Sequence, residues 1–369
     1  MTLRMPLLKK KPSNNFFTRE PRVSIADARG FCLPCAGQSK LDDVDEGVSR
    51  AEGQQADGSV SKADQAAAAR LGTVRFRLDI SYDGTDFAGW AMQPGLRSIE
   101  DTLMATLAMI LRLPVAPRLV VAGRTDAGVH ATGQVVHVDL PEGVIDLGDS
   151  DVGDGDVGGG NGVRAMTPEA TLRRLNGALG FNSDVVVRSF AVAADGFDAR
   201  FSPIARRYEY RIFDRVESVN PLERHNTVRF HGRLESDAMN AAAGLLVGLR
   251  DFGAFCKLRP GATTIRELQV FTWERTRTGA LVATLQADAF CHSMVRALIG
   301  ATVAVGEGRL SPDDLTVVRD EALRTSDFTV MPAHGLTLTE VIYPAEAELG
   351  PRAELTRRRR ELTDEPEIA

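Results

Sequence analysis

The chain has 369 residues, of which 43% are hydrophobic, so it can bury one large core or two smaller ones. No apolar run approaches the roughly eighteen residues that a membrane helix needs, and the first residues lack the charged-then-apolar pattern of a secretory signal. Four cysteines in a chain of this length are too few for a disulfide framework. The sequence therefore predicts a cytoplasmic protein without a membrane segment.

The formal net charge of −6 does not by itself suggest a protein that binds nucleic acid. The negative charge is concentrated, however, in residues 141–163, which hold six carboxylates and no lysine or arginine. The rest of the chain is neutral overall, with local arginine clusters around Arg173 and around Arg206. A basic groove for RNA is therefore permitted by the composition but not required by it.

Three segments lack the apolar periodicity of a folded domain. Residues 1–70 are polar and irregular, and we predict a disordered N-terminal extension there. Residues 141–163, rich in glycine and aspartate, are predicted to be a flexible insertion. Their carboxylates would repel RNA, so we expect the insertion to point away from any basic groove. Residues 349–369 form a charged tail, whose arginine run suits either RNA phosphates or a solvated surface.

Between the extension and the tail, residues 71–195 suggest a first folded half. Residues 74–82 alternate apolar and polar side chains, which predicts a half-buried strand. Ser98 is placed to cap a helix, with Asp101 in its first turn. Later elements are expected as strands at 118–122 and 134–140, a helix from Thr167 and Pro168, and a strand at 185–190. The order is β-α-β-β-α-β.

Residues 196–348 repeat this order. The predicted elements are strands at 207–213, 268–274, 281–288 and 336–343, and helices from Ser236, from Phe290 to about Val305, and from Ser311. Two ferredoxin-like units usually carry their helices on one sheet face and leave the other face or the junction for ligands. We therefore predict an α+β fold of two ferredoxin-like (βαββαβ) halves, which form an extended antiparallel sheet with the helices on one face and a central cleft.

The sequence G-R-T-D-A-G-V-H at residues 123–130 falls in the predicted connection between the second and third strands. A carboxylate close to Arg124 on a tight loop, here Asp126, can act as a nucleophile or a base. The same spacing also suits a turn in which the aspartate caps its own backbone and the arginine lies on the surface. Spacing alone leaves both interpretations open.

Several segments match one known family in its own order. They are Y-D-G-T-D-F-A-G-W at 82–90, G-R-T-D-A-G-V-H-A-T-G-Q-V-V at 123–136, F-D-A-R-F-S at 197–202, A-R-R-Y-E-Y at 205–210, D-F-G-A-F at 251–255 and A-F-C-H-S-M-V-R at 289–296. In this respect the chain resembles the tRNA pseudouridine synthase A family over roughly residues 72–345. Ala91 and Met92 depart from the polar pair, typically Gln-Arg, that follows the family's tryptophan.

The resemblance implies an isomerase that converts uridine to pseudouridine in the anticodon stem-loop of tRNA, at positions 38, 39 and 40. It implies no cofactor and no metal, and a homodimer whose joint surface binds one tRNA. The enzyme would cleave the N1 glycosidic bond, turn the uracil, rejoin it through C5 and remove the C5 proton.

The family's functional residues map onto four positions. Asp126 would be the catalytic carboxylate, which either attacks the nucleoside or removes a ribose proton. Tyr208 would lie against the uracil and assist the last proton loss, while Tyr210 is assigned to the core. Arg296 would pair with Asp126, and Arg124 would help to extrude the target nucleotide and hold its phosphate. The ordinary structural alternatives are a packed strand tyrosine and exposed surface arginines.

Two other kinds of protein were weighed against this assignment. A non-catalytic RNA-binding protein would use the same sheets as a platform, but it would not need the set of Asp126, Arg124, Tyr208 and Arg296. A hydrolase using Asp126 as a base would need a second carboxylate in a matching motif, and none is present.

Cys32 and Cys35 form a C-x-x-C pair, which suits half a zinc site or a redox pair, but no second pair or histidine cluster lies near it in the sequence. We therefore interpret them as two thiols in the predicted N-terminal extension.

Overall fold

The computed structural model describes residues 72–148, 165–257 and 263–357, which all belong to one structural unit. The predicted N-terminal extension, residues 149–163 of the acidic insertion and residues 358–369 of the tail lie outside these ranges. No helix of the described ranges is long and apolar enough to cross a membrane.

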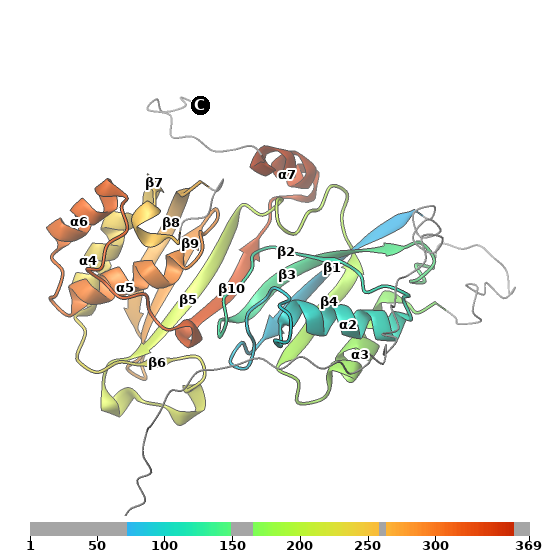
Figure 1. The fold of residues 1–369 in the computed structure, drawn as a ribbon, viewed down its shortest axis with the longest axis horizontal. Helices are drawn as coiled ribbons and strands as arrows, with labels where there is room; N and C mark the ends of the chain where they lie inside the picture. The colour runs from blue at the N-terminus through green and yellow to red at the C-terminus, as the bar shows by residue number, and fades with distance from the viewer. Residues whose placement is uncertain (1–71, 149–164, 258–262, 358–369) are drawn as a thin grey trace, which may run out of the picture. The chain divides into compact units, whose positions relative to one another are not determined.

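The protein has an α+β fold built on one large, mostly antiparallel sheet, as predicted (Figure 1). The strands of the described residues are β1 (Thr73–Tyr82), β2 (Leu119–Val121), β3 (His130–Pro141), β4 (Val185–Val192), β5 (Ala205–Phe213), β6 (Val228–Arg229), β7 (Gly248–Asp251), β8 (Ile265–Arg275), β9 (Leu281–Ala287) and β10 (Leu336–Ile342). Their order is β4-β1-β3-β10-β5-β9-β8-β7, with β2 paired to β3 and β6 paired to β5.

The last strand joins the two parts of the sheet. β10 pairs in parallel with β3 and in antiparallel fashion with β5, so it lies between strands from the first and second halves of the sequence (Figure 1). Leu338 of β10, which is fully buried, is opposite Ala131 on one side and Tyr208 on the other. Hydrogen bonding is therefore continuous across the junction of the two halves.

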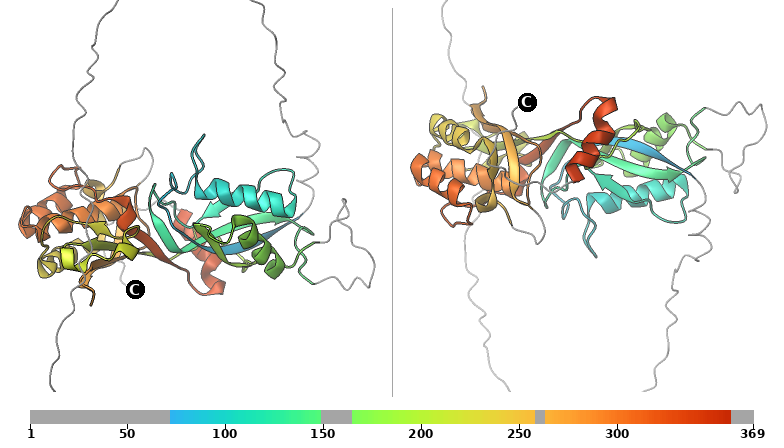
Figure 2. Two further views of the ribbon diagram at one scale, coloured as in Figure 1. Left: turned by 90° about the horizontal axis from the view of Figure 1, so that it is seen from below. Right: turned by 90° about the horizontal axis from the view of Figure 1, so that it is seen from above.

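The described residues also form α-helices, which pack against the sheet. They are α2 (Ile99–Leu111), α3 (Pro168–Leu179), α4 (Ser236–Leu246), α5 (Met294–Gly306), α6 (Pro312–Glu321) and α7 (Leu349–Arg357). Helix α7 falls in the segment predicted as a charged tail, and it lies on the opposite side of the sheet from α2 (Figure 2). The helices of the described residues therefore do not all lie on one face, in contrast to the prediction. Leu349 and Ala353 of α7 are buried, so this helix packs against the fold.

Capping side chains set the starts of α2, α3 and α6 where the sequence predicts them. Ser98 accepts a hydrogen bond from the Asp101 amide at α2, and Ser311 and Asp314 form a reciprocal capping box at α6. The predicted start of α5 at Phe290 is wrong, because the helix begins at Met294. Ser293 has a φ of 63°, a left-handed conformation that cannot continue an α-helix.

Candidate functional site

Buried polar side chains of β1 and β3 bind the connection from β2 to β3, residues 122–129. The Tyr82 and Thr125 hydroxyls are 2.8 Å apart, and the Gln134 amide donates to Tyr82 at 3.2 Å and to the Gly123 carbonyl at 2.8 Å. Burial raises the pKa of Tyr82 to about 12, so its hydroxyl keeps its proton for this network. The first part of the loop is therefore anchored to β1 and β3.

The segment that follows β1 supports the loop from its other side. The Trp90 amide donates to the Thr125 carbonyl at 3.0 Å, and the Gly128 amide donates to the Phe87 carbonyl at 3.3 Å. Gly89 has a φ of 102°, and a Cβ there would lie 2.9 Å from the Thr125 carbonyl oxygen. Glycine lets the two backbones approach this closely.

His130 connects the end of this loop to the second half of the chain. Its Nδ1 accepts the Gly84 N–H at 3.0 Å, while its Nε2 lies 2.8 Å from the His225 carbonyl and 3.0 Å from the His334 carbonyl. Because carbonyl oxygens only accept, Nε2 carries the ring proton. Asp83 Oδ1 is 3.1 Å from Nδ1, but an ion pair there would require a second ring proton. His130 therefore acts as a structural hydrogen-bonding residue.

The Asp126 carboxylate faces the segment that leads into α5. Its Oδ2 is 3.5 Å from Arg296 Nη1 and 3.4 Å from Ser293 Oγ, and its Oδ1 is 3.5 Å from His292 Nε2. These distances are at the long end of hydrogen bonding, and the Asp126 side chain is 32% exposed. Among the described residues no backbone amide donates to it, so the carboxylate does not cap its own turn. It is held by donors yet accessible.

Arg296 is oriented by the backbone that precedes β10. Its Nε donates to the Met331 carbonyl at 2.6 Å, and the Met331 amide donates to the Arg296 carbonyl at 3.2 Å. The other residues of α5 are buried, so Arg296 stands at the one partly open position of this helix. With Nε bonded to this carbonyl, Nη1 lies 3.5 Å from Asp126 Oδ2.

Tyr208 lies on β5, in the centre of the sheet, between Leu338 of β10 and Leu285 of β9. It is 8% exposed, and its ring makes an edge-to-face contact with Phe290 at 5.2 Å. Burial raises the pKa of Tyr208, and the nearby Asp126 carboxylate adds to the shift. The phenol therefore stays protonated at neutral pH.

The Tyr208 hydroxyl differs from those of the other tyrosines. The hydroxyls of Tyr82, Tyr210 and Tyr343 are bonded to Thr125, the Pro332 carbonyl and the Ala199 carbonyl. Within the described residues, no group makes a hydrogen bond to the hydroxyl of Tyr208. Tyr208 thus combines a buried ring with a hydrogen-bond donor that a bound molecule can use, while Tyr210 is a core residue, as predicted.

Arg124 lies on the same loop as Asp126 but points outward. Its side chain is exposed, and it has no hydrogen bond or ion pair with any residue that the structure describes. A guanidinium without a partner among the described residues, on the loop of Asp126, suits an external anion such as a phosphate. The structure thus brings together Asp126, Arg296 and Tyr208, while Arg124 is exposed on the same loop as Asp126.

Sequence reasoning missed Ser293 as a neighbour of Asp126. The helix was expected to run through this position, which would have directed the side chain elsewhere. No local pattern signalled the break before Met294, because a serine rarely adopts the left-handed conformation that Ser293 has here. No group of three or more potential metal ligands occurs within the described ranges.

Comparison with known proteins identifies the family. The family model described as tRNA pseudouridine synthase matches residues 242–344. A tRNA pseudouridine synthase A of Leifsonia xyli subsp. xyli is 55% identical over 290 residues, which cover 78% of this chain and 98% of that protein. Those of Frankia casuarinae and Streptomyces griseus are 50% and 48% identical, over 78% and 80% of this chain and 95% and 96% of their own lengths. This chain therefore belongs to the tRNA pseudouridine synthase A family, whose members are isomerases.

Proposed function

We propose that this protein isomerises uridine to pseudouridine in the anticodon stem-loop of tRNA, at positions 38, 39 and 40, with Asp126 as the catalytic carboxylate. One observation carries the proposal. Asp126 lies within 3.5 Å of Arg296 Nη1, which comes from a distant part of the chain. The buried ring of Tyr208 is near the same carboxylate, and its hydroxyl has no partner in the described residues.

The surroundings of Asp126 suit the first step of the reaction, in which the N1 glycosidic bond breaks. Two routes are open to the carboxylate, which either attacks the nucleoside or removes a ribose proton. Both need an accessible oxygen, and the side chain of Asp126 is 32% exposed. Arg296 and Ser293 both approach Oδ2, so Oδ1 is the oxygen with fewer donors and the better placed for substrate.

Tyr208 is proposed to hold the detached uracil while it turns. An aromatic ring stacks on a base irrespective of the direction of the base edges, so rotation within the pocket does not lose the contact. The raised pKa of Tyr208 keeps the phenol neutral, which makes it a hydrogen-bond donor during C5 bond formation. A neutral phenol does not accept the C5 proton itself, so Tyr208 assists the last step by donating a hydrogen bond to the uracil while water accepts the proton.

The two arginines are proposed to have different tasks. Arg296 orients Asp126, since its own Nε is fixed by the Met331 carbonyl. Arg124 is exposed and unpaired among the described residues, so it is suited to bind the phosphate of the extruded nucleotide. An enzyme that acts on a base must first unstack it, and a cation on the loop of Asp126 stabilises the extruded backbone.

The sheet order supports a proposal about architecture. In the first half β4-β1-β3-β2 and in the second half β10-β5-β9-β8 have the same relative order of last, first, third and second strand. We infer two ferredoxin-like halves with a catalytic cleft at their junction. From the family resemblance we further propose a homodimer that binds one tRNA in the cytoplasm and needs no cofactor.

The decisive experiment measures tritium release from tRNA labelled at uracil C5, because formation of the C5 glycoside expels that proton. Asp126→Asn keeps the shape of the side chain and should lower the rate by about 10³-fold or more. Asp237→Asn, at an exposed aspartate in the first turn of α4, is the matched control and should retain the parental rate. Release by Asp126→Asn at the parental rate would refute the catalytic assignment.

The target positions need a separate measurement. Transcripts that keep uridine at only one of positions 38, 39 and 40 should each release tritium with the parent protein. Release only from uridines elsewhere in the tRNA would refute the anticodon assignment and leave the role of Asp126 untouched.

A further inference from the structure

Arg206 is a buried cation beside the site that no step of the proposed reaction uses. It lies on β5, two residues before Tyr208, and is 7% exposed. In the described part of the chain it forms no ion pair with a carboxylate; its guanidinium is bound by carbonyl oxygens instead. Burying a charge is costly unless strong dipoles compensate for it. The carbonyls must therefore stay within hydrogen-bonding distance of the Arg206 guanidinium.

Three separate segments supply the carbonyls. Nη1 donates to Asp288 O at 2.6 Å, and Nη2 donates to Ala122 O at 3.0 Å and to Arg200 O at 2.8 Å. Ala122 opens the loop that carries Asp126, and Asp288 follows β9 and leads toward Ser293 and Arg296. One planar group therefore joins the two stretches of backbone whose side chains meet at the site.

Both stretches are already fixed by contacts with their own halves. The Ala122 amide donates to the Val135 carbonyl at 2.9 Å, and the Asp288 amide donates to the Glu267 carbonyl at 3.2 Å. Arg206 adds the link between them, because its fork holds the two carbonyls at a set separation. A change in that link would alter the distance between Asp126 and the start of α5.

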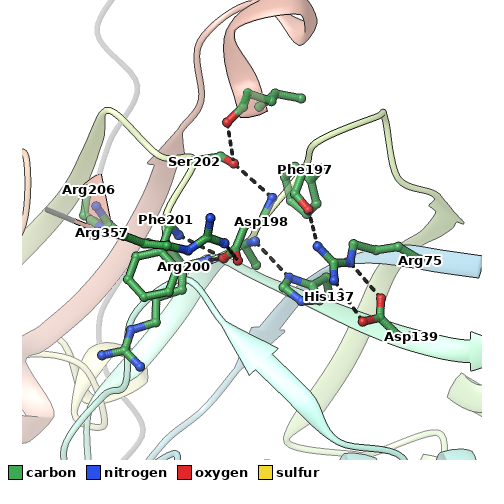
Figure 3. Close-up of polar contacts among 12 residues, drawn as sticks. Arg75, His137, Asp139, Phe197, Asp198, Arg200, Phe201, Ser202, Arg206 and Arg357 are labelled. Carbon is green, nitrogen blue, oxygen red and sulfur yellow. Dashed lines mark hydrogen bonds and ion pairs between the residues drawn. The ribbon is translucent and has the colours of Figure 1, made fainter. Parts of the chain in front are cut away.

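The third carbonyl, that of Arg200, belongs to the loop between β4 and β5, which several hydrogen bonds hold in place. Asp198 accepts the amides of Arg200 and Phe201 at 2.8 and 3.0 Å, and it pairs with Arg357 of α7 at 3.0 Å (Figure 3). Ser202 donates to the Leu349 carbonyl at the start of α7 at 3.0 Å (Figure 3). The Arg200 carbonyl is thus a fixed point against which the guanidinium is oriented.

We propose that Arg206 is a positioning residue for the isomerisation, which sets the distance between the Asp126 loop and the segment that carries Ser293 and Arg296. The inference rests on the proposed function, since it assigns Arg206 an effect on the rate through Asp126. Lysine at this position keeps the charge, but its single ammonium cannot reproduce a planar fork that reaches three carbonyls.

The test compares Arg206→Lys and Arg206→Gln with Arg275→Lys in the full-length protein. Arg275 is the control, because its guanidinium likewise donates to a backbone carbonyl, that of Gly279, and it also pairs with Asp214. It lies on β8 opposite Leu281, at the end of β9 that is far from Asp288. Three quantities are measured for each variant: the single-turnover rate of tritium release, the Kd for tRNA and the midpoint of urea-induced unfolding. Since misplacement of reacting groups by about 1 Å costs on the order of 100-fold in rate, Arg206→Lys should be about 10- to 100-fold slower.

The pattern of effects separates positioning from stability. The Kd for tRNA should be unchanged in both Arg206 variants, and Arg275→Lys should lose stability without losing rate. Hydrogen exchange should rise at 122–129 and at 287–293 in Arg206→Lys, and not in α2. A parental rate in Arg206→Lys, an equal slowing in Arg275→Lys, or loss of folding in both Arg206 variants would overturn the proposal. A parent that binds tRNA but releases no tritium would instead refute the proposed function itself.

Discussion

Replacing Gly89 with alanine should displace the loop of Asp126 without touching any side chain of the site. The added Cβ would lie 2.9 Å from the Thr125 carbonyl oxygen and 3.1 Å from both the Ala127 nitrogen and the Asp126 carbonyl carbon. All three atoms belong to backbone, so no flexible side chain can move aside. The loop itself must shift by a few tenths of an ångström, and the carboxylate moves with it.

The size of the effect follows from two contributions. Alanine at the Gly89 φ of 102° costs about 1–3 kcal/mol, and the overlap with packed backbone adds about 1–3 kcal/mol. Gly95→Ala provides the control, because Gly95 has a φ of 73° and nothing within 4 Å of an added Cβ. It should show only the backbone cost, about 1 kcal/mol.

Two assays measure the consequences. Urea unfolding should give a larger loss of stability for Gly89→Ala than for Gly95→Ala. Tritium release should give a kcat at least about tenfold lower for Gly89→Ala, since the carboxylate is displaced, and a parental kcat for Gly95→Ala. Equal losses of stability in the two variants, with a parental kcat for Gly89→Ala, would show that the loop does not depend on this close approach.

Three further predictions concern individual side chains. Tyr208→Phe should keep the parental stability, because no intramolecular hydrogen bond is lost, and should lower kcat about tenfold or more; an unchanged kcat would remove the hydroxyl from the mechanism. Arg124→Gln should weaken tRNA binding and lower the slope of log Kd against log salt concentration by about one. Arg277→Gln, at an exposed arginine of the β8–β9 turn, should change neither quantity. Equal slopes for Arg124→Gln and the parent protein would contradict a phosphate contact. Burial lowers the pKa of His137 below its ordinary 6.5, and its Nδ1 accepts the Ala199 amide, so protonation favours the unfolded chain. The free energy of unfolding should therefore fall as pH drops below about 6.5. In urea unfolding, His137→Gln should show a weaker pH dependence of this free energy than the parent protein. The same pH dependence in both proteins would show that other groups cause the loss.

Short-range patterns in the sequence predicted much of the fold. The alternation in 74–82 corresponds to β1, whose inward residues Phe76, Leu78 and Ile80 are buried. Ser98 and Ser311 set the starts of their helices, because a cap needs only a side chain and amides within the same turn. The start of α5 was wrong, since nothing local signals the left-handed conformation of Ser293.

The site is different, because its residues come from distant parts of the chain. Asp126 and Arg296 are separated by 170 residues, and no periodicity relates them. The sequence motif predicted that the two would pair by resemblance to a family, but it carried no information about Ser293 or about the three carbonyls around Arg206. Those contacts depend on the pairing of β10 between β3 and β5.

The sequence by itself determined the α+β class, the strand and helix periodicities and the loop that carries Asp126. These features depend on side-chain alternation, capping and turn residues, which act over a few positions. Only the tertiary structure decided which polar groups surround Asp126, which tyrosine hydroxyl has no partner among the described residues and which arginine bridges the two halves. The physical reason is that long-range strand pairing and the burial of a cation against carbonyls depend on the whole sheet and leave no periodic trace in the chain.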